Sequence, residues 1–249
     1  MEGLDNCVAL EELELYDNRI AHIANLAQLT NMVFLDLSFN RIKEIQGLST
    51  LVNLKKLYLS ANRIRKMENL EGLTNLTVLD VGDNKIRHIE NVAHLTELQE
   101  FYAAKNKLTS LKGLESLTRL EIVACQCNFI QNLEGLETLV DLEELYLQQN
   151  QVQSFEGLHS NHKLTTIDLA MNKLSKFEHL DHLWGVLKEL WLNWNNLGNT
   201  EANRAYLAEM KTLQTLYLAD NPLANQADYY KIVTEAIPKL YQLDGNVIA

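Results

Sequence analysis

Residues 54–62 read Leu54-Lys55-Lys56-Leu57-Tyr58-Leu59-Ser60-Ala61-Asn62, and most of the chain repeats this arrangement. Hydrophobic and polar side chains alternate around Leu57, and this period of two predicts a short β-strand. Because side chains of a strand point alternately to its two faces, the leucines on either side of Tyr58 are expected to enter a core and Tyr58 to point outward. Asn62 then ends the strand at a turn.

The pattern L-x-x-L-x-L-x-x-N-x-L recurs ten times along the chain. Its asparagines are Asn18, Asn40, Asn62, Asn84, Asn106, Asn128, Asn150, Asn172, Asn195 and Asn221. The first eight are 22 residues apart, and the last two intervals are 23 and 26 residues. Such a fixed period predicts a solenoid, in which each repeat forms one coil and buries its leucines against the next coil.

The segments between the strands predict tight returns. Ile64, Met67, Leu70 and Leu73 follow one another at intervals of three, which is typical of 3₁₀-like turns. The side-chain amide of each repeated asparagine is expected to bond backbone groups that the turn leaves unpaired. We therefore predict an α/β leucine-rich-repeat solenoid, with a curved parallel β-sheet on the concave face and 3₁₀ or short helical returns on the convex face.

The C-terminal part predicts a helical cap. Thr200 can cap a helix over residues 201–210, and residues 228–236 carry an apolar stripe that ends before Pro238. Leu240 and Leu243 then begin a partial coil. We predict a single domain over residues 1–249, with about ten repeats in 4–223 and the cap in 224–249.

The N-terminus predicts no such cap, because residues 2–10 align with residues 46–54 and the chain begins in the middle of a coil. We expect either that the sequence is a piece of a longer protein or that a partner or a second copy covers the opening. Residues 1–5 contain neither a basic region nor an apolar stretch, so no signal peptide is expected. The longest apolar runs fall far short of the roughly 20 residues of a membrane helix.

Composition narrows the classes of partner. A net charge of −11 disfavours nucleic-acid binding, which needs clustered Lys and Arg, and suits a partner with basic groups. The three cysteines are Cys7, Cys125 and Cys127, an odd and sparse set that indicates a reducing compartment. Cys125 occupies an inward leucine position and is expected in the core, whereas Cys127 is expected to be partly exposed.

The sequence contains no phosphate loop, nucleophile elbow or dinucleotide fingerprint. His159 with His162, and His179 with His182, have tolerable spacing for a metal, but they fall in returns and lack further ligands for a closed site. We therefore expect structural or solvated histidines, and we predict no enzyme activity, no cofactor and no metal.

The outward positions of the strands are the candidate binding surface. Nothing in the packing of the repeat requires aromatic residues there, yet five of the ten side chains between the strand leucines are aromatic, although aromatic residues make up 7% of the chain. Together with the outward positions two residues earlier they include eight acids and one lysine. We predict a protein-binding face of aromatic anchors and acids. The predicted residues are Asp36, Tyr58, Asp80, Tyr102, Tyr146, Asp168, Glu189, Trp191 and Tyr217.

The 22-residue unit is similar to the intracellular leucine-rich-repeat subclass. Within it, the chain resembles the regulatory subunit 7 family of protein phosphatase 1 over residues 4–245. The segments that carry this resemblance are residues 142–147, residues 163–174, Asn221-Pro222-Leu223, Tyr229-Tyr230, Pro238 and Leu243-Asp244. The acidic tail and first repeat of that family are missing here, and residues 244–249 depart from its C-terminal tail.

The resemblance implies a non-catalytic subunit whose concave face holds the catalytic subunit of protein phosphatase 1 and controls its maturation, activity or placement, notably in mitosis. It also implies a ternary complex with a small phosphatase inhibitor, and a place in the nucleus and cytoplasm. It assigns all the predicted residues except Tyr146 to phosphatase contact. The alternative is a scaffold of the same class for another intracellular partner, such as a splicing, tubulin-folding or axonemal component. No nucleic-acid or membrane partner is expected.

Overall fold

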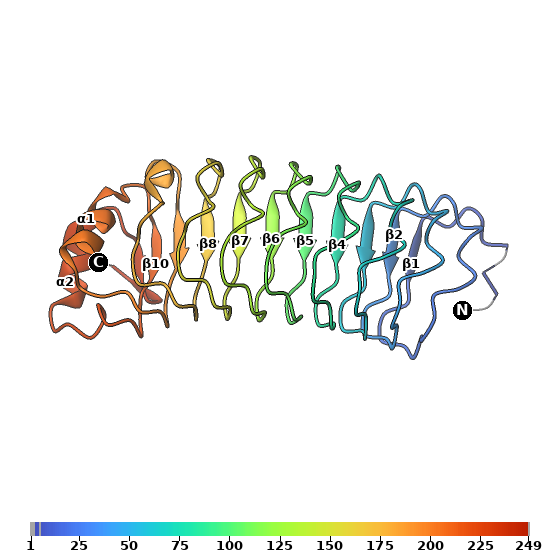
Figure 1. Ribbon diagram of the computed structural model, residues 1–249, viewed down its shortest axis with the longest axis horizontal. Helices are drawn as coiled ribbons and strands as arrows, with labels where there is room; N and C mark the ends of the chain where they lie inside the picture. Colours follow the sequence, from blue (N-terminus) through green and yellow to red (C-terminus); the bar gives the residue numbers. More distant parts are fainter. Residues whose placement is uncertain (1–2, 5, 249) are drawn as a thin grey trace.

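The computed structural model describes residues 3–4 and 6–248 and forms an elongated solenoid (Figure 1). The coils follow one another in chain order along the long axis, and each coil adds one strand to the same sheet. The strands of the ten repeats are β1 (Glu12–Glu14), β2 (Phe34–Asp36), β3 (Lys56–Tyr58), β4 (Val78–Asp80), β5 (Glu100–Tyr102), β6 (Ile122–Ala124), β7 (Glu144–Tyr146), β8 (Thr166–Asp168), β9 (Glu189–Trp191) and β10 (Thr215–Tyr217). They pair in parallel, so the predicted solenoid is confirmed.

The register of the sheet keeps equivalent residues of the repeats side by side. Leu57 lies opposite Leu35 in β2 and opposite Leu79 in β4. The longer ninth and tenth repeats preserve this register, because Asp168 still lies beside Trp191 and Trp191 beside Tyr217. The additional residues of these repeats are therefore accommodated in the returns.

The core is a continuous column of leucine and related side chains. Leu57 and Leu59 are both fully buried, and the cluster to which they belong extends from Ile23 to Leu243. Burial of one such side chain stabilises the fold by about 1.5–3 kcal/mol. In the first coil Leu13 and Leu15 are only half-buried, because a neighbouring coil packs on one side of them alone.

The returns contain the predicted i→i+3 hydrogen bonds, mostly as isolated turns. Leu51 N donates to Leu48 O and Leu54 N to Leu51 O, both at 3.0 Å. In the described part of the chain, only η1 (Asp181–Leu183) forms a 3₁₀ helix. Some returns pass so close to the previous coil that no side chain fits: at Gly113, with φ 109°, a Cβ would lie 2.1 Å from Ile89 O. A 22-residue coil therefore leaves little room for a helix.

The repeated asparagines join neighbouring coils, as predicted. Asn106 Nδ2 donates to Ala103 O of its own coil at 3.2 Å and to Val81 O of the preceding coil at 2.9 Å. Its Oδ1 accepts from Ile86 N of the preceding coil at 2.9 Å. The side chain is buried, so water could replace its hydrogen bonds to these backbone groups only if the coil opened locally.

Replacing Asn106 with Ala is therefore expected to lower the free energy of unfolding by about 1–3 kcal/mol, the usual cost of stranding buried polar groups. Chemical denaturation of the variant and the parent protein measures the difference. Binding through the sheet should persist in the folded fraction, because Asn106 does not point to its outer face. A variant of unchanged stability that has lost partner binding would show that the asparagines act in recognition.

The residue before each repeated asparagine has a left-handed backbone, which the sequence did not reveal. The φ angles at these ten positions lie between 47° and 60°, and none of the residues is glycine. They include Phe39, Lys105, Cys127, Met171 and Trp194. This conformation costs roughly 1–2 kcal/mol for a residue with a side chain, and the asparagine hydrogen bonds that follow hold the turn in place. Large side chains such as Phe39 and Trp194 are thereby presented to solvent.

Both predicted C-terminal helices are confirmed. Helix α1 (Glu201–Glu209) begins after Thr200, whose Oγ1 accepts from Asn203 N at 3.1 Å, and α2 (Tyr229–Ala236) ends two residues before Pro238. With nine and eight residues, neither helix has the length needed to cross a membrane, and no other described helix does.

The end of the sheet differs from the sequence prediction. Strand β11 (Gln242–Leu243) continues the parallel order, but β12 (Asn246–Val247) turns back antiparallel to it. Asp244 stands between them: its Oδ1 accepts from Leu218 N and Ala219 N, and its Oδ2 accepts from the Tyr229 hydroxyl at 2.7 Å. One carboxylate thus supplies the acceptors for the backbone of the last full coil and fixes α2 to it.

Candidate functional site

The outward side chains of β1–β10 form one surface, here termed the sheet face. The last residues of the strands form its end row, in which Asp36, Tyr58 and Asp80 are consecutive register partners. The first residues form a parallel start row, in which Glu189 lies between Thr166 and Thr215. The structure therefore places the nine predicted residues on the same face, eight of them in the end row and Glu189 in the start row.

The aspartates of the end row have a local backbone role that the charge pattern did not indicate. Asp36 Oδ1 accepts from Ser38 N at 2.8 Å, Asp80 Oδ1 from Gly82 N at 2.8 Å, and Asp168 Oδ1 from Ala170 N at 3.0 Å. Asp side chains commonly form such turns with the residue two positions on. One oxygen of each carboxylate thus shapes the strand exit, and the recurrence of Asp at this position was the available signal.

The side chain of Asp168 is less accessible than expected for a charged residue of a binding surface. Its residue surface is only 1% exposed, and its register neighbours are the aromatic residues Tyr146 and Trp191. Burial raises the pKa of its carboxyl, although the Ala170 N–H opposes the shift. Asp80, which is half-buried, has a pKa raised for the same reason. A partner must therefore approach closely to reach Asp168, whereas Asp36 and Asp80 remain more open.

Two tyrosines of the end row are held by glutamates of the start row. Tyr102 donates its hydroxyl to Glu100 Oε2 and Tyr146 to Glu144 Oε2, each at 2.7 Å. The pKa of both tyrosines is raised, mainly by burial and to a smaller extent by these hydrogen bonds. Both hydroxyls therefore stay protonated and can donate at neutral pH. Glu100 and Glu144 therefore belong to the site, although they were not among the predicted residues.

Between these tyrosines the sheet face is hollow. The intervening strand carries Ala124, which is buried between the two taller side chains. The hollow has a volume of about 480 Å³ and continues over the strand exits of the preceding coils. Its lining consists of Phe39, Ser60, Ala61, Asp80, Gly82, Asp83, Tyr102, Ala104, Lys105, Ala124, Gln126 and Tyr146. The lining thus combines small residues and aromatic rings with four longer charged or polar side chains, and the recess can receive a side chain of a partner.

Aromatic residues gather at the C-terminal end of the sheet face. The rings of Trp191 and Tyr217 are tilted against each other with centroids 5.6 Å apart. Trp191 Nε1 is buried and has no hydrogen-bond partner among the residues that the structure describes. Trp194, at the left-handed position of the same coil, is 54% exposed. This cluster offers rigid apolar area, the kind of surface that dominates protein interfaces.

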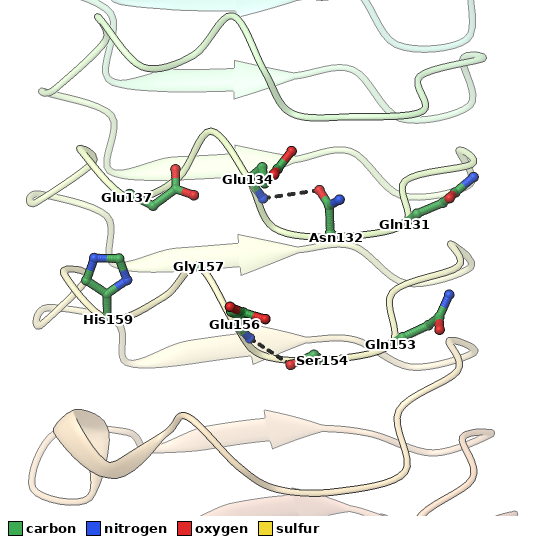
Figure 2. A pocket seen from close by; sticks show the side chains of 9 residues that line it. All are labelled: Gln131, Asn132, Glu134, Glu137, Gln153, Ser154, Glu156, Gly157 and His159. Atoms are coloured by element: carbon green, nitrogen blue, oxygen red, sulfur yellow. Dashed lines mark hydrogen bonds between the residues drawn. The ribbon is translucent and has the colours of Figure 1, made fainter.

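Another hollow lies on the side of the returns (Figure 2). It has a volume of about 510 Å³ and is lined by polar side chains of two adjacent coils, including Glu134, Glu137 and His159. Several of them serve the turns: Glu134 N donates to Asn132 Oδ1, and Gly135 N to Glu137 Oε2. Their positions are therefore explained by the returns.

The rings of His159 and His162, and those of His179 and His182, are not the ones that meet, although their spacing in sequence was tolerable for a shared metal. The close contact is instead between His162 and His182 of neighbouring coils, whose rings meet edge-on at 5.4 Å. Burial lowers the pKa of His182. No group of three His, Cys, Asp or Glu residues suited to a metal ion occurs in the described part of the chain.

The cysteines occupy three different environments. Cys125 is fully buried, as predicted, and burial raises the pKa of its thiol to about 12. Cys127 is half-buried, and Cys7 is exposed. All three are free.

Alkylation of the native protein is expected to modify Cys7 fastest and Cys127 more slowly, and to leave Cys125 unmodified because the reactive thiolate is inaccessible there. Mass spectrometry after timed treatment with iodoacetamide measures this order. After denaturation without reductant, all three thiols should react. Protection of two cysteines under those conditions would indicate a disulfide and contradict the expected reducing compartment.

Comparison with known proteins agrees with this architecture. The family described as "Leucine Rich repeats (2 copies)" matches residues 8–50, 52–94, 96–138 and 140–182. No curated protein matches the sequence. The functional domain of InlJ from Listeria monocytogenes, which includes a cysteine ladder, is 23% identical with a TM-score of 0.75, over 88% of this chain and 46% of the other.

Two further structures are similar. A leucine-rich-repeat protein of Leptospira interrogans is 23% identical with a TM-score of 0.74, over 94% of this chain and 66% of the other. Internalin C2 from Listeria monocytogenes is 26% identical with a TM-score of 0.71, over 79% and 84%. The chain thus spans about half of the InlJ structure and about two thirds of the Leptospira protein. At these identities the likeness concerns the fold.

Proposed function

The chain belongs to the leucine-rich-repeat family, and from its sequence resemblance within that family we propose that it is a non-catalytic regulatory subunit of protein phosphatase 1, of the regulatory subunit 7 type, which holds the catalytic subunit on its sheet face. Leucine-rich-repeat solenoids are scaffolds suited to protein–protein interaction, since their stacked strands create long binding surfaces. The choice of partner rests on the sequence resemblance. The proposed role is to control the maturation, activity or placement of the phosphatase in the nucleus and cytoplasm, including in mitosis.

The observation that carries the proposal is the composition of the end row. Tyr58, Tyr102, Tyr146, Trp191 and Tyr217 present aromatic side chains on one face, and carboxylates lie among them. Ten strands about 4.8 Å apart line roughly 45 Å, enough for an interface of standard size or larger. Aromatic anchors beside acids suit a partner surface with apolar pockets and basic groups.

A binding titration of the purified protein with the protein phosphatase 1 catalytic subunit tests the proposal. We expect saturable one-to-one binding by calorimetry, and we expect the catalytic subunit to be the main protein retained from a cell extract. If the extract yields another protein and the purified phosphatase does not bind, the chain is a scaffold for a different partner. Addition of a small phosphatase inhibitor to the preformed complex tests the proposed ternary assembly.

Asp168→Asn is expected to weaken phosphatase binding about three- to tenfold and to reduce its dependence on salt, because the variant removes a charge from the interface. Asn keeps an acceptor for Ala170 N, so the strand exit should stay folded. Calorimetric titrations at two salt concentrations measure both effects. Asp168→Ala is the less direct variant, because it also strands that backbone N–H. Wild-type affinity and salt dependence in Asp168→Asn would exclude this carboxylate from recognition.

A further inference from the structure

One edge of the solenoid is basic although the chain carries a net charge of −11. The first five coils have Arg or Lys directly after the repeated asparagine, and coils two to four have a second basic residue two positions later. These residues, here termed the basic edge, are Arg19, Arg41, Lys43, Arg63, Arg65, Lys85, Arg87 and Lys107. All eight are exposed.

The backbone holds the basic edge in register. Arg63 N donates to Ile42 O, Lys85 N to Ile64 O, and Lys107 N to Ile86 O, each at 2.8 Å. Equivalent residues of successive coils are therefore about 4.8 Å apart, as in a parallel ladder. Four of the side chains enclose one hollow of about 250 Å³ with no other residue in its lining, namely Arg65, Lys85, Arg87 and Lys107. Like charges at such distances repel one another.

Acidic side chains lie nearby, since Glu44 and Glu68 line an adjoining hollow with Lys43 and Arg65, but in the described part of the chain they do not pair with the basic edge. Within residues 3–4 and 6–248, none of the eight side chains forms an ion pair or a side-chain hydrogen bond, although basic residues elsewhere do: Lys112 pairs with Glu134 at 2.9 Å and Lys163 with Asp141 at 2.6 Å. The edge also ends abruptly, because Phe129 and Gln151 occupy its positions in the next two coils. The unpaired charges are thus confined to about 20 Å.

We infer that the basic edge binds a short acidic segment of a partner protein, extended along the first five coils. Carboxylates spaced along an extended chain could each approach a basic side chain and relieve the repulsion within the edge. The confinement of the edge favours a protein segment over a nucleic acid. The attraction of the basic edge extends only about 8–10 Å beyond it, because salt screens charges over that distance. The parts of a polyanion longer than the edge would therefore lie beside a protein surface that is acidic overall. The exposed aromatic rings of Tyr16 and Phe39 come before the asparagine turns, and Phe39 lines the hollow of the sheet face, so they do not give the basic edge a stacking surface for bases.

This site is separate from the sheet face and does not depend on the proposed phosphatase partner. The basic side chains come after the asparagine turn, whereas the aromatic anchors come before it. A partner that presents a basic surface to the sheet face and an acidic segment to the basic edge could use both at once. Trp191→Ala should therefore leave binding at the basic edge unchanged, which distinguishes failure of one proposal from failure of the other.

Fluorescence anisotropy of a labelled oligoglutamate peptide at low ionic strength tests the inference. Reversing two charges of the hollow, in Arg65→Glu with Arg87→Glu, should weaken peptide binding about tenfold or more, or roughly 1.4 kcal/mol. The matched control is Lys173→Glu with Lys176→Glu, which changes the net charge equally in the eighth coil. It should weaken binding less than about twofold. Melting curves should show that both variants fold.

Three results would overturn the inference. Absence of saturable peptide binding at low ionic strength would show that the edge is merely solvated. An equal loss in both double variants would assign the effect to net charge. A single-stranded RNA that binds more tightly than the peptide, and loses affinity in Arg65→Glu with Arg87→Glu, would make the edge a nucleic-acid surface.

Discussion

Trp191→Ala is expected to weaken binding of the protein phosphatase 1 catalytic subunit by about 30-fold or more. Aromatic anchors in an interface commonly contribute about 2 kcal/mol or more, and each 1.4 kcal/mol corresponds to a tenfold change in affinity. Trp191 packs against Tyr217 and is the register neighbour of the buried Asp168, so its removal eliminates apolar area from this part of the sheet face. Calorimetric titration of the variant measures the loss.

The control is Tyr241→Ala, which truncates an aromatic side chain that is 61% exposed and lies outside the sheet face. It should bind with nearly the affinity of the parent protein. Melting curves of both variants should stay close to the parent, because neither side chain belongs to the leucine core. If Trp191→Ala binds the phosphatase with the affinity of the parent protein, the interface does not include the sheet face around Trp191 and must lie on the returns or on an edge.

Phe101→Ala is expected to lower the free energy of unfolding by about 3–5 kcal/mol, the usual range for truncating a buried phenylalanine. Phe101 is fully buried in β5, between Leu79 of β4 and Val123 of β6. A coil can collapse only slightly around the space left by the ring, because its backbone is fixed to both neighbours by the ladder of hydrogen bonds. Chemical denaturation measures the change.

The adjacent residue provides an internal comparison. Tyr102 points to the opposite side of the same strand, and Tyr102→Ala removes a similar ring from the sheet face. Its effect on stability should be less than about 1 kcal/mol, whereas its effect on phosphatase binding should exceed that of any change in the returns. If the two variants destabilised equally, the assignment of the two sides of β5 would be wrong.

The repeat was sufficient to predict the architecture, because a 22-residue period fixes both the strand and its neighbours. Leu57, Asn62 and their equivalents occur where packing and turn geometry permit few alternatives, and both C-terminal helices carried recognisable signals such as Thr200. The antiparallel strand β12 and the role of Asp244 could not be predicted, since they depend on which side chains meet after the last coil closes.

The sheet face was predicted only in outline. Alternation was enough to bring the aromatic and acidic residues to one side, but not to show how deep each side chain lies. Asp168 is buried, and its register neighbours Tyr146 and Trp191 are 22 and 23 residues away in sequence, so this environment arises only when the coils stack. The pairing of Tyr102 with Glu100 likewise depends on rotamers that a residue pattern does not specify. Partner binding by these residues remains a prediction.

The asparagine ladder also gives the solenoid a direction. Asn40 and the later repeated asparagines reach back to the preceding coil, as Asn106 does to Val81 and Ile86. Among the described residues, the side-chain amide of Asn18 bonds only Leu15 and Tyr16 of its own coil. Part of the protection of each coil's backbone amides against hydrogen exchange therefore comes from the asparagine of the coil that follows it. Hydrogen exchange in Asn106→Ala should accelerate at the Ile86 amide, one coil toward the N-terminus, and much less at Leu108, whose amide is held by Asn128. A local defect in this protein would thus be felt upstream.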